Sequence, residues 1–189
     1  LINKQPSFFT VPLMDASSFK SIREIRINTM HYLMWLRKFY FNIEHSYKTA
    51  PYYQPILELL HATFDKRHEF ISSLALDSII QTCSYLGINT EIIHTSSVFQ
   101  NSDLRGEERV IAICNKLNAG VYINPIGGTE LYSKDSFLAK NISLSFIRPY
   151  SVSYQQNVKE DILWLSIIDV MMFNAVDQSR LLLENYLLE

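Results

Sequence analysis

The residues best suited to chemistry lie in one stretch, 121–132, with the sequence Val-Tyr-Ile-Asn-Pro-Ile-Gly-Gly-Thr-Glu-Leu-Tyr. Its first half is apolar and β-branched, which is typical of a strand. Pro125 and the pair Gly127–Gly128 interrupt the strand, because proline lacks a ladder donor and glycine permits a positive φ or the close approach of a ligand. Thr129 follows as an N-cap for a helix. Ligands of open α/β sheets bind at such strand ends, so we expect a site here; the alternative is a plain tight turn.

The groups of this turn suit a small anionic ligand. The backbone N–H groups of Gly127–Gly128 and Thr129 are placed to hold a phosphate or carboxylate at a helix N-terminus. Asn124 can orient a ligand amide or hydroxyl, and Glu130 is the candidate general base. Tyr132 can donate a hydrogen bond or stack on a sugar ring.

A second candidate is Asp169, which lies inside the apolar stretch 162–173. A helix that is apolar on nearly all sides is buried, and leaving a buried carboxylate unpaired costs several kcal/mol. Two interpretations follow. Asp169 is either a functional group that orients one of the groups at the turn, or a structural one that binds backbone donors.

Two serines, Ser96 and Ser97, follow a predicted strand at 91–95 that carries His94. A Ser–His pair can act as nucleophile and base. Neighbouring residues on a strand point to opposite faces, however. We therefore expect the two serines to cap a loop or to bind an oxyanion through their hydroxyl groups.

The first half of the chain predicts two strands and three helices. Alternating apolar residues mark strands at 7–13 and 22–27. Helical spacing marks a helix at 31–47, a second with Pro55 in its first turn, and a third that ends at Gly87. The aromatic stripe of the first helix is expected in the core.

In the second half, predicted strands and helices alternate. Short connections between them argue for a parallel sheet, and two helices, at 162–173 and 178–188, follow. The sequence therefore predicts an α/β fold: a single domain, 1–189, with a mainly parallel sheet flanked by helices, a helical insertion in the first half and C-terminal helices. The alternating elements are a strand at 91–95, a helix from Ser102 or Asp103, the strand from Val121, a short helix at 135–139 and a strand at 142–147.

Composition restricts the class of protein. The chain has 189 residues, 48% apolar residues and a net charge of -2, so we expect a globular chain without a nucleic-acid surface. Cys83 and Cys114 lie in apolar helical patterns, which fits buried thiols and a reducing, cytoplasmic setting. No signal peptide is visible, and the longest apolar run is too short to span a bilayer. Composition leaves cofactor and oligomeric state open.

Several motifs of well-known enzyme classes are missing from the sequence. It contains no G-x-G-x-x-G dinucleotide motif, no P-loop lysine motif and no G-x-S-x-G nucleophile motif. The five histidines form no H-E-x-x-H pair or Cys/His cluster, so we expect no metal site.

Several stretches together resemble the WbqC-like protein family, and the resemblance covers nearly the whole chain. The most specific is the run Tyr-x-Asn-Pro-x-Gly-Gly-x-x-Leu-Tyr within 119–132. Members of that family begin with a Gln-Pro-rich, aromatic strand and loop, followed by an Asp-rich strand. Because the present sequence starts at Leu1 without them, the resemblance implies that this N-terminal strand and loop are missing. The other matching stretches are 10–12, 22–27, Trp35, 47–52, 85–88 and 165–173.

The resemblance also implies a biological setting. The family occurs among bacterial surface-polysaccharide genes, including O-antigen clusters, and a role in amino-sugar modification, including glycine transfer, has been proposed for it. We therefore expect an enzyme that transfers a small acyl or glycyl group to a nucleotide-activated amino sugar, with Glu130 as base.

Two alternatives remain open. One is a non-catalytic sugar-binding or assembly protein of the same pathway. The other is nucleotidyl transfer, which needs a phosphate site and usually a metal ion. In the assembly alternative, exposed aromatic residues of the first half form a surface for a partner: Trp35, Phe39, Tyr40, Tyr52 and Tyr53.

Overall fold

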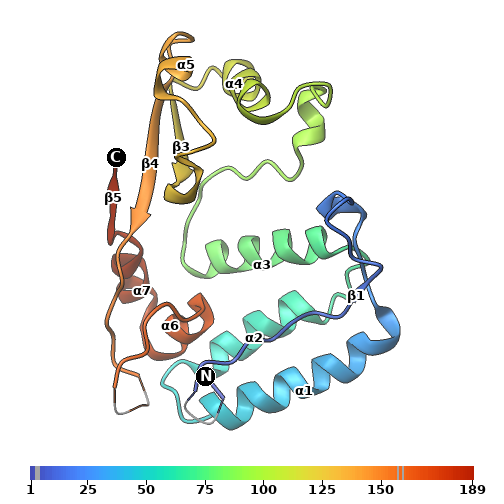
Figure 1. The fold of residues 1–189 in the computed structure, drawn as a ribbon. Helices are drawn as coiled ribbons and strands as arrows, with labels where there is room; N and C mark the ends of the chain where they lie inside the picture. The colour runs from blue at the N-terminus through green and yellow to red at the C-terminus, as the bar shows by residue number, and fades with distance from the viewer. Residues whose placement is uncertain (3–4, 157, 159) are drawn as a thin grey trace. The chain divides into compact units, whose positions relative to one another are not determined.

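The computed structural model describes residues 1–2, 5–156, 158 and 160–189. It contains two compact units, each built from two separate segments of the chain (Figure 1). The first comprises residues 1–92 and 152–182, and the second comprises residues 93–151 and 183–189. Within the described residues, no helix is long and apolar enough to cross a membrane.

The first unit is mainly helical. Two short strands, β1 (Leu13–Met14) and β2 (Arg26–Ile27), pair antiparallel, and a 3-10 turn, η1 (Ile22–Glu24), precedes β2. The strands predicted at 7–13 and 22–27 are therefore far shorter than expected. The three predicted helices are confirmed, and two more follow near the C-terminus. The helices are α1 (Thr29–Tyr47), α2 (Tyr53–Phe64), α3 (Ile71–Tyr85), α6 (Ile167–Phe173) and α7 (Val176–Leu183).

The core of the first unit gathers around the buried face of α1. Residues spaced by about one helical turn, among them Phe39 and Tyr47, pack with Leu60 of α2 and Met171 of α6. The expectation that the aromatic stripe lies in the core is confirmed. The residues expected to form an exposed partner surface instead lie in this core or pack against it: Trp35, Phe39, Tyr40, Tyr52 and Tyr53.

The second unit contains a three-stranded sheet in the order β3-β4-β5. β3 is parallel to β4, with Asn124 opposite Phe146, and β4 is antiparallel to β5. One side of the sheet packs on a small core that includes Cys114 and Phe137. The elements are η2 (Ser96–Phe99), α4 (Gly106–Lys116), β3 (Val121–Pro125), η3 (Ile126–Gly128), α5 (Lys134–Leu138), β4 (Ser143–Pro149) and β5 (Tyr186–Leu188).

The α/β class is confirmed, but the sheet is mixed rather than mainly parallel. Residues 91–95 form an irregular and mostly exposed segment, so the strand predicted there is wrong. The helix predicted at 178–188 stops at Leu183, and 186–188 form an edge strand instead. Backbone bonds between Phe146 and Glu189, at 2.8 and 2.9 Å, complete this antiparallel edge.

Two further differences concern local signals. The helix predicted at 162–173 begins only at Ile167, because Trp164 has a left-handed φ of 62° and Ser166 is the N-cap. Both cysteines are free thiols; Cys114 is buried as expected, whereas Cys83 is only half-buried.

Candidate functional site

The turn after β3 is shaped by a contact between Asn124 and Gly128. A Cβ atom on Gly128 would lie 2.8 Å from Asn124 Nδ2 and 3.0 Å from its Cγ, whereas a Cβ on Gly127 would meet no atom within 4 Å. Neither glycine has a positive φ. Any larger residue at 128 would therefore require Asn124, a side chain of the same turn, to shift.

The helix N-terminus expected at Thr129 does not occur there. The Thr129 N–H group donates to the Ile126 carbonyl at 3.3 Å, and the next helix, α5, begins at Lys134 with Ser133 as its N-cap. The prediction that Thr129 caps a helix is wrong, because the chain makes a further turn first. It stays a prediction that this turn binds substrate through Asn124, Gly127, Gly128 and Thr129. No helix dipole at Thr129 supports that prediction.

The two remaining groups of the turn differ in exposure. Glu130 is exposed to solvent, as a candidate base must be to meet a substrate. Tyr132 is half-buried, and its ring meets those of Tyr122 and Phe137 edge-on, with centroids 5.9 and 6.1 Å apart. Burial is the main cause, and the neighbouring Tyr132 the second, that raises the pKa of Tyr122 to about 12. The Tyr132 ring thus packs at the edge of the core of the second unit. Less of the ring is therefore available to stack on a sugar than we expected.

Ser96 and Ser97 belong to the turn η2. The Ser97 N–H group donates to Thr95 Oγ1 at 3.2 Å, and Ser96 Oγ accepts from Arg109 Nη2 at 3.1 Å. Arg109 also donates to the buried Asn101 at 3.3 Å. The cap of this turn is therefore Thr95 rather than either serine, and oxyanion binding by Ser96 and Ser97 stays a prediction.

Asp169 is the most distinctive polar group of the first unit. It is 2% exposed, and each of its carboxylate oxygens accepts a hydrogen bond from a tyrosine. Tyr47 Oη donates to Oδ2 and Tyr154 Oη donates to Oδ1, both at 2.7 Å. Tyr47 Oη in turn accepts a hydrogen bond from the Leu1 nitrogen. Two tyrosine hydroxyls thus occupy the places expected for backbone donors.

Sequence reasoning did not find these tyrosines. Tyr47 lies 122 residues from Asp169 in the chain and Tyr154 lies 15 residues away, so no local spacing connects them. The only available signal was that a buried carboxylate needs donors and that the first unit is rich in tyrosine.

The environment of the cluster keeps both tyrosines protonated. Burial, then the hydrogen bond to Asp169 and its negative charge, raise the pKa of Tyr47 and of Tyr154 far above the ordinary value. Both hydroxyls therefore remain donors throughout the physiological pH range. Both oxygens of Asp169 act as acceptors of these two bonds.

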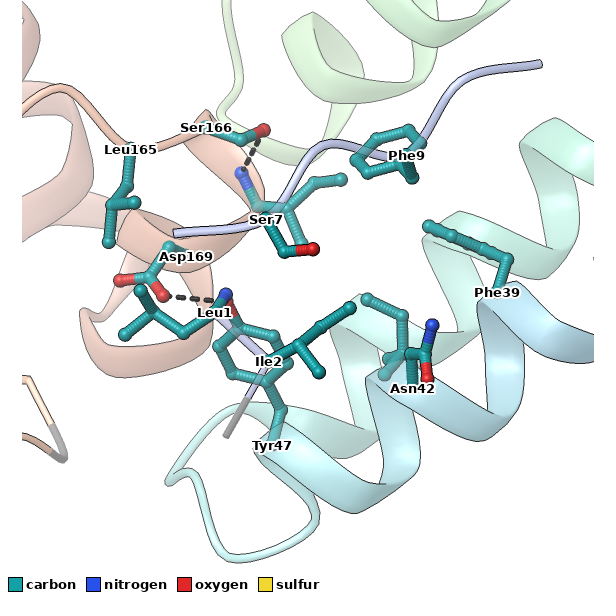
Figure 2. Close-up of a pocket in the computed structure, with 12 residues that line it drawn as sticks. Leu1, Ile2, Ser7, Phe9, Phe39, Asn42, Tyr47, Leu165, Ser166 and Asp169 are labelled. Carbon is teal, nitrogen blue, oxygen red and sulfur yellow. Dashed lines mark hydrogen bonds between the residues drawn. The ribbon is translucent and has the colours of Figure 1, made fainter. Parts of the chain in front are cut away.

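A cavity of about 80 Å³ lies beside this cluster. Figure 2 shows Asp169 and Tyr47 on one side of it and Phe39 and Asn42 on the other. Ser166, whose Oγ accepts from the Ile168 N–H at 3.3 Å, also lines the cavity. The site thus combines a buried carboxylate with the Leu1 nitrogen and mostly apolar walls.

No positive side chain among the described residues forms an ion pair with Asp169; the ion pairs found there involve other carboxylates. That part of the chain also contains no group of three or more His, Cys, Asp or Glu residues arranged to hold a metal ion. Asp169 belongs to the first unit and Glu130 to the second, and their cooperation stays a prediction.

Comparison with known proteins gives one result. The model of the WbqC-like protein family matches residues 1–181, which include parts of both units. No curated protein and no solved structure matches the chain.

Proposed function

Because the chain belongs to the WbqC-like protein family, we propose that it transfers a small acyl or glycyl group to the amine of a nucleotide-activated amino sugar in bacterial surface-polysaccharide biosynthesis. The observation that carries the proposal is the buried Asp169, which two tyrosines hold beside a cavity. A mostly apolar cavity with a few polar groups, among them a buried carboxylate, is typical of sites that bind small molecules.

Transfer to an amine requires that the nitrogen attack the acyl carbon, lose a proton and expel the donor's leaving group. A carboxylate can take that proton. We assign this role to Glu130, which is exposed on the turn after β3. Asp169 would position an amine, since its two oxygens have more acceptor sites than the two tyrosine bonds use. Asn124 and the backbone at Gly127–Gly128 would contact the substrate.

The direct test is a transfer assay followed by mass spectrometry. A nucleotide-activated amino sugar and activated acyl or glycyl donors are incubated with the protein, and Glu130→Gln is compared with Glu108→Gln, a second exposed carboxylate of the same unit. Loss of a general base lowers turnover by roughly 10²–10⁴-fold, so we expect this loss for Glu130→Gln alone. A fully active Glu130→Gln variant would remove Glu130 from the mechanism.

One observation favours the assembly alternative. The outer face of α1 exposes Met30, Met34 and Phe41 by 84%, 67% and 66%, and exposed apolar patches often mark protein contacts. In that case Met34→Lys would abolish polysaccharide production in cells, whereas Glu130→Gln would leave it intact. The transferase proposal predicts the opposite pattern.

A further inference from the structure

We infer that the outer face of α1 binds the surface of an anionic lipid bilayer. Figure 1 shows α1 at the end of the row formed by α1, α2 and α3. Its outer face is the stripe of exposed side chains that recur at helical spacing and so lie along one side of the helix: Met30, Met34, Arg37, Phe41 and, at the C-cap, Lys48. The inference does not rest on the proposed function, since transfer to a nucleotide sugar in solution needs no membrane.

The first argument is the exposure of large apolar side chains. Met30, Met34 and Phe41 are exposed by 84%, 67% and 66%, whereas the opposite side of α1 packs into the core of the first unit. The solvent side of a helix in a globular protein normally carries polar residues. Helices that bind a bilayer surface instead place apolar side chains about 5–10 Å into the boundary between headgroups and acyl chains.

The second argument is charge. The exposed charged residues between positions 29 and 48 are Arg37, Lys38 and Lys48 against the single carboxylate of Glu44, although the whole chain has a net charge of -2. The ion pairs found among the described residues involve none of these three basic side chains. This face is therefore positive, as attraction to the phosphate groups of anionic lipids requires.

The mixture of lysine and apolar residues favours a lipid surface over a protein partner. Lysine is depleted in the centre of protein–protein interfaces. On a bilayer, the aliphatic stem of a lysine or arginine lies along apolar surface while its charge stays among the headgroups. Lys38 and Lys48 lie on either side of Phe41 in the helix, so insertion of the phenyl ring would leave both ammonium groups at the level of the headgroups.

The test is co-sedimentation of the whole chain with vesicles of phosphatidylcholine alone and of an equal mixture of phosphatidylcholine and phosphatidylglycerol. We expect strong binding to the mixed vesicles, weak binding to phosphatidylcholine, and a loss of binding at high salt, which screens surface charges.

Two variants separate the apolar contribution from the charged one. Phe41→Ser should weaken binding to the mixed vesicles by about tenfold, and Lys38→Gln by about fivefold. The matched controls lie in the second unit and should bind as the native chain does: Leu138→Ser, at a residue 68% exposed, and Lys140→Gln, at an exposed lysine. All four changes are at exposed positions, and circular dichroism checks that each variant is folded.

Three results would overturn the inference. The first is the absence of the chain from sedimented mixed vesicles. The second is binding that the α1 variants and their controls weaken equally, or that Phe41→Ser leaves unchanged, because adsorption would then come from charge alone. The third is a dimer in solution that Phe41→Ser separates, without vesicle binding, which would assign this face to a second copy of the chain.

Discussion

At the scale of single residues, Asp169 depends on two hydroxyl groups that are remote from it in sequence. Tyr154 Oη donates to Oδ1 and Tyr47 Oη to Oδ2. A buried acceptor that loses its donor keeps the cost of desolvation without the compensating bond. The stability of the first unit is therefore tied to the same groups that shape the candidate site.

This dependence predicts the effect of Tyr154→Phe. The change removes the donor to Asp169 Oδ1 and should lower the free energy of unfolding by about 1–3 kcal/mol. Tyr150→Phe is the matched control, because Tyr150 is 52% exposed and should change stability by less than about 0.5 kcal/mol. Urea denaturation measures both. Equal stability of the two variants would show that the Tyr154 bond contributes nothing.

At the scale of elements, the turn after β3 depends on the fit between Gly128 and Asn124. Gly128→Ala would place a methyl group 2.8 Å from Asn124 Nδ2, so Asn124 must move. We expect a loss of about 1–3 kcal/mol in the free energy of unfolding, and almost none for Gly127→Ala, where a Cβ would meet no atom within 4 Å.

A double-mutant cycle completes this test by denaturation. Asn124→Ala removes the obstructing amide, so Gly128→Ala should cost much less in that background. If Gly128→Ala is equally costly with and without Asn124, its cost has another cause than this contact.

The hydrogen bonds that join the α2–α3 connection to Asp77 of α3 predict that the stability of the protein depends on pH. Burial acts to raise the pKa of Asp77, but hydrogen bonds from Lys66, Gln81 and His68 outweigh burial and hold the pKa below its ordinary value of 3.8. Because the folded-state pKa is lowered, Asp77 adds stability above its ordinary pKa. That stability is lost as the pH falls through the folded-state pKa.

The measurement compares urea midpoints of the native chain and Asp77→Asn at about pH 6 and about pH 3. The variant should be less stable at the higher pH, and the difference should shrink at the lower pH. A difference that stays constant with pH would contradict this role of the Asp77 carboxylate.

The comparison of elements shows which of them could be predicted from the sequence. α1, α2 and α3 were predicted correctly because their apolar residues recur at helical spacing and face one core. Residues 91–95 have the apolar pattern of a strand, but they form no strand and remain mostly exposed. A strand needs a partner, and short local patterns do not reveal whether one exists.

Pairing with a distant strand also determines the structure of the C-terminal segment. The stretch 178–188 has helical spacing, yet 186–188 pair with β4. At the candidate site, sequence reasoning found Asp169 and expected donors around it. It did not identify Tyr47 and Tyr154, because nothing in the sequence links residues that meet only through folding.

At the scale of the whole molecule, neither unit is a continuous piece of chain. The chain passes between the units after residues 92, 151 and 182, and the core of the first unit joins α2 to Met171 and Met172 of α6. The family match over 1–181 likewise extends across both units. We therefore treat the turn in the second unit and the cavity in the first as parts of one proposed function.

The most direct test of that function is a thermal titration of the chain with a nucleotide-activated amino sugar, beside its N-acetylated counterpart. At about a hundredfold excess over its Kd, a ligand that binds only the folded protein stabilises it by about 2.7 kcal/mol. We predict this stabilisation for the sugar with a free amine, and less for the acetylated one. The absence of any stabilisation by nucleotide sugars would contradict the account and favour an assembly role.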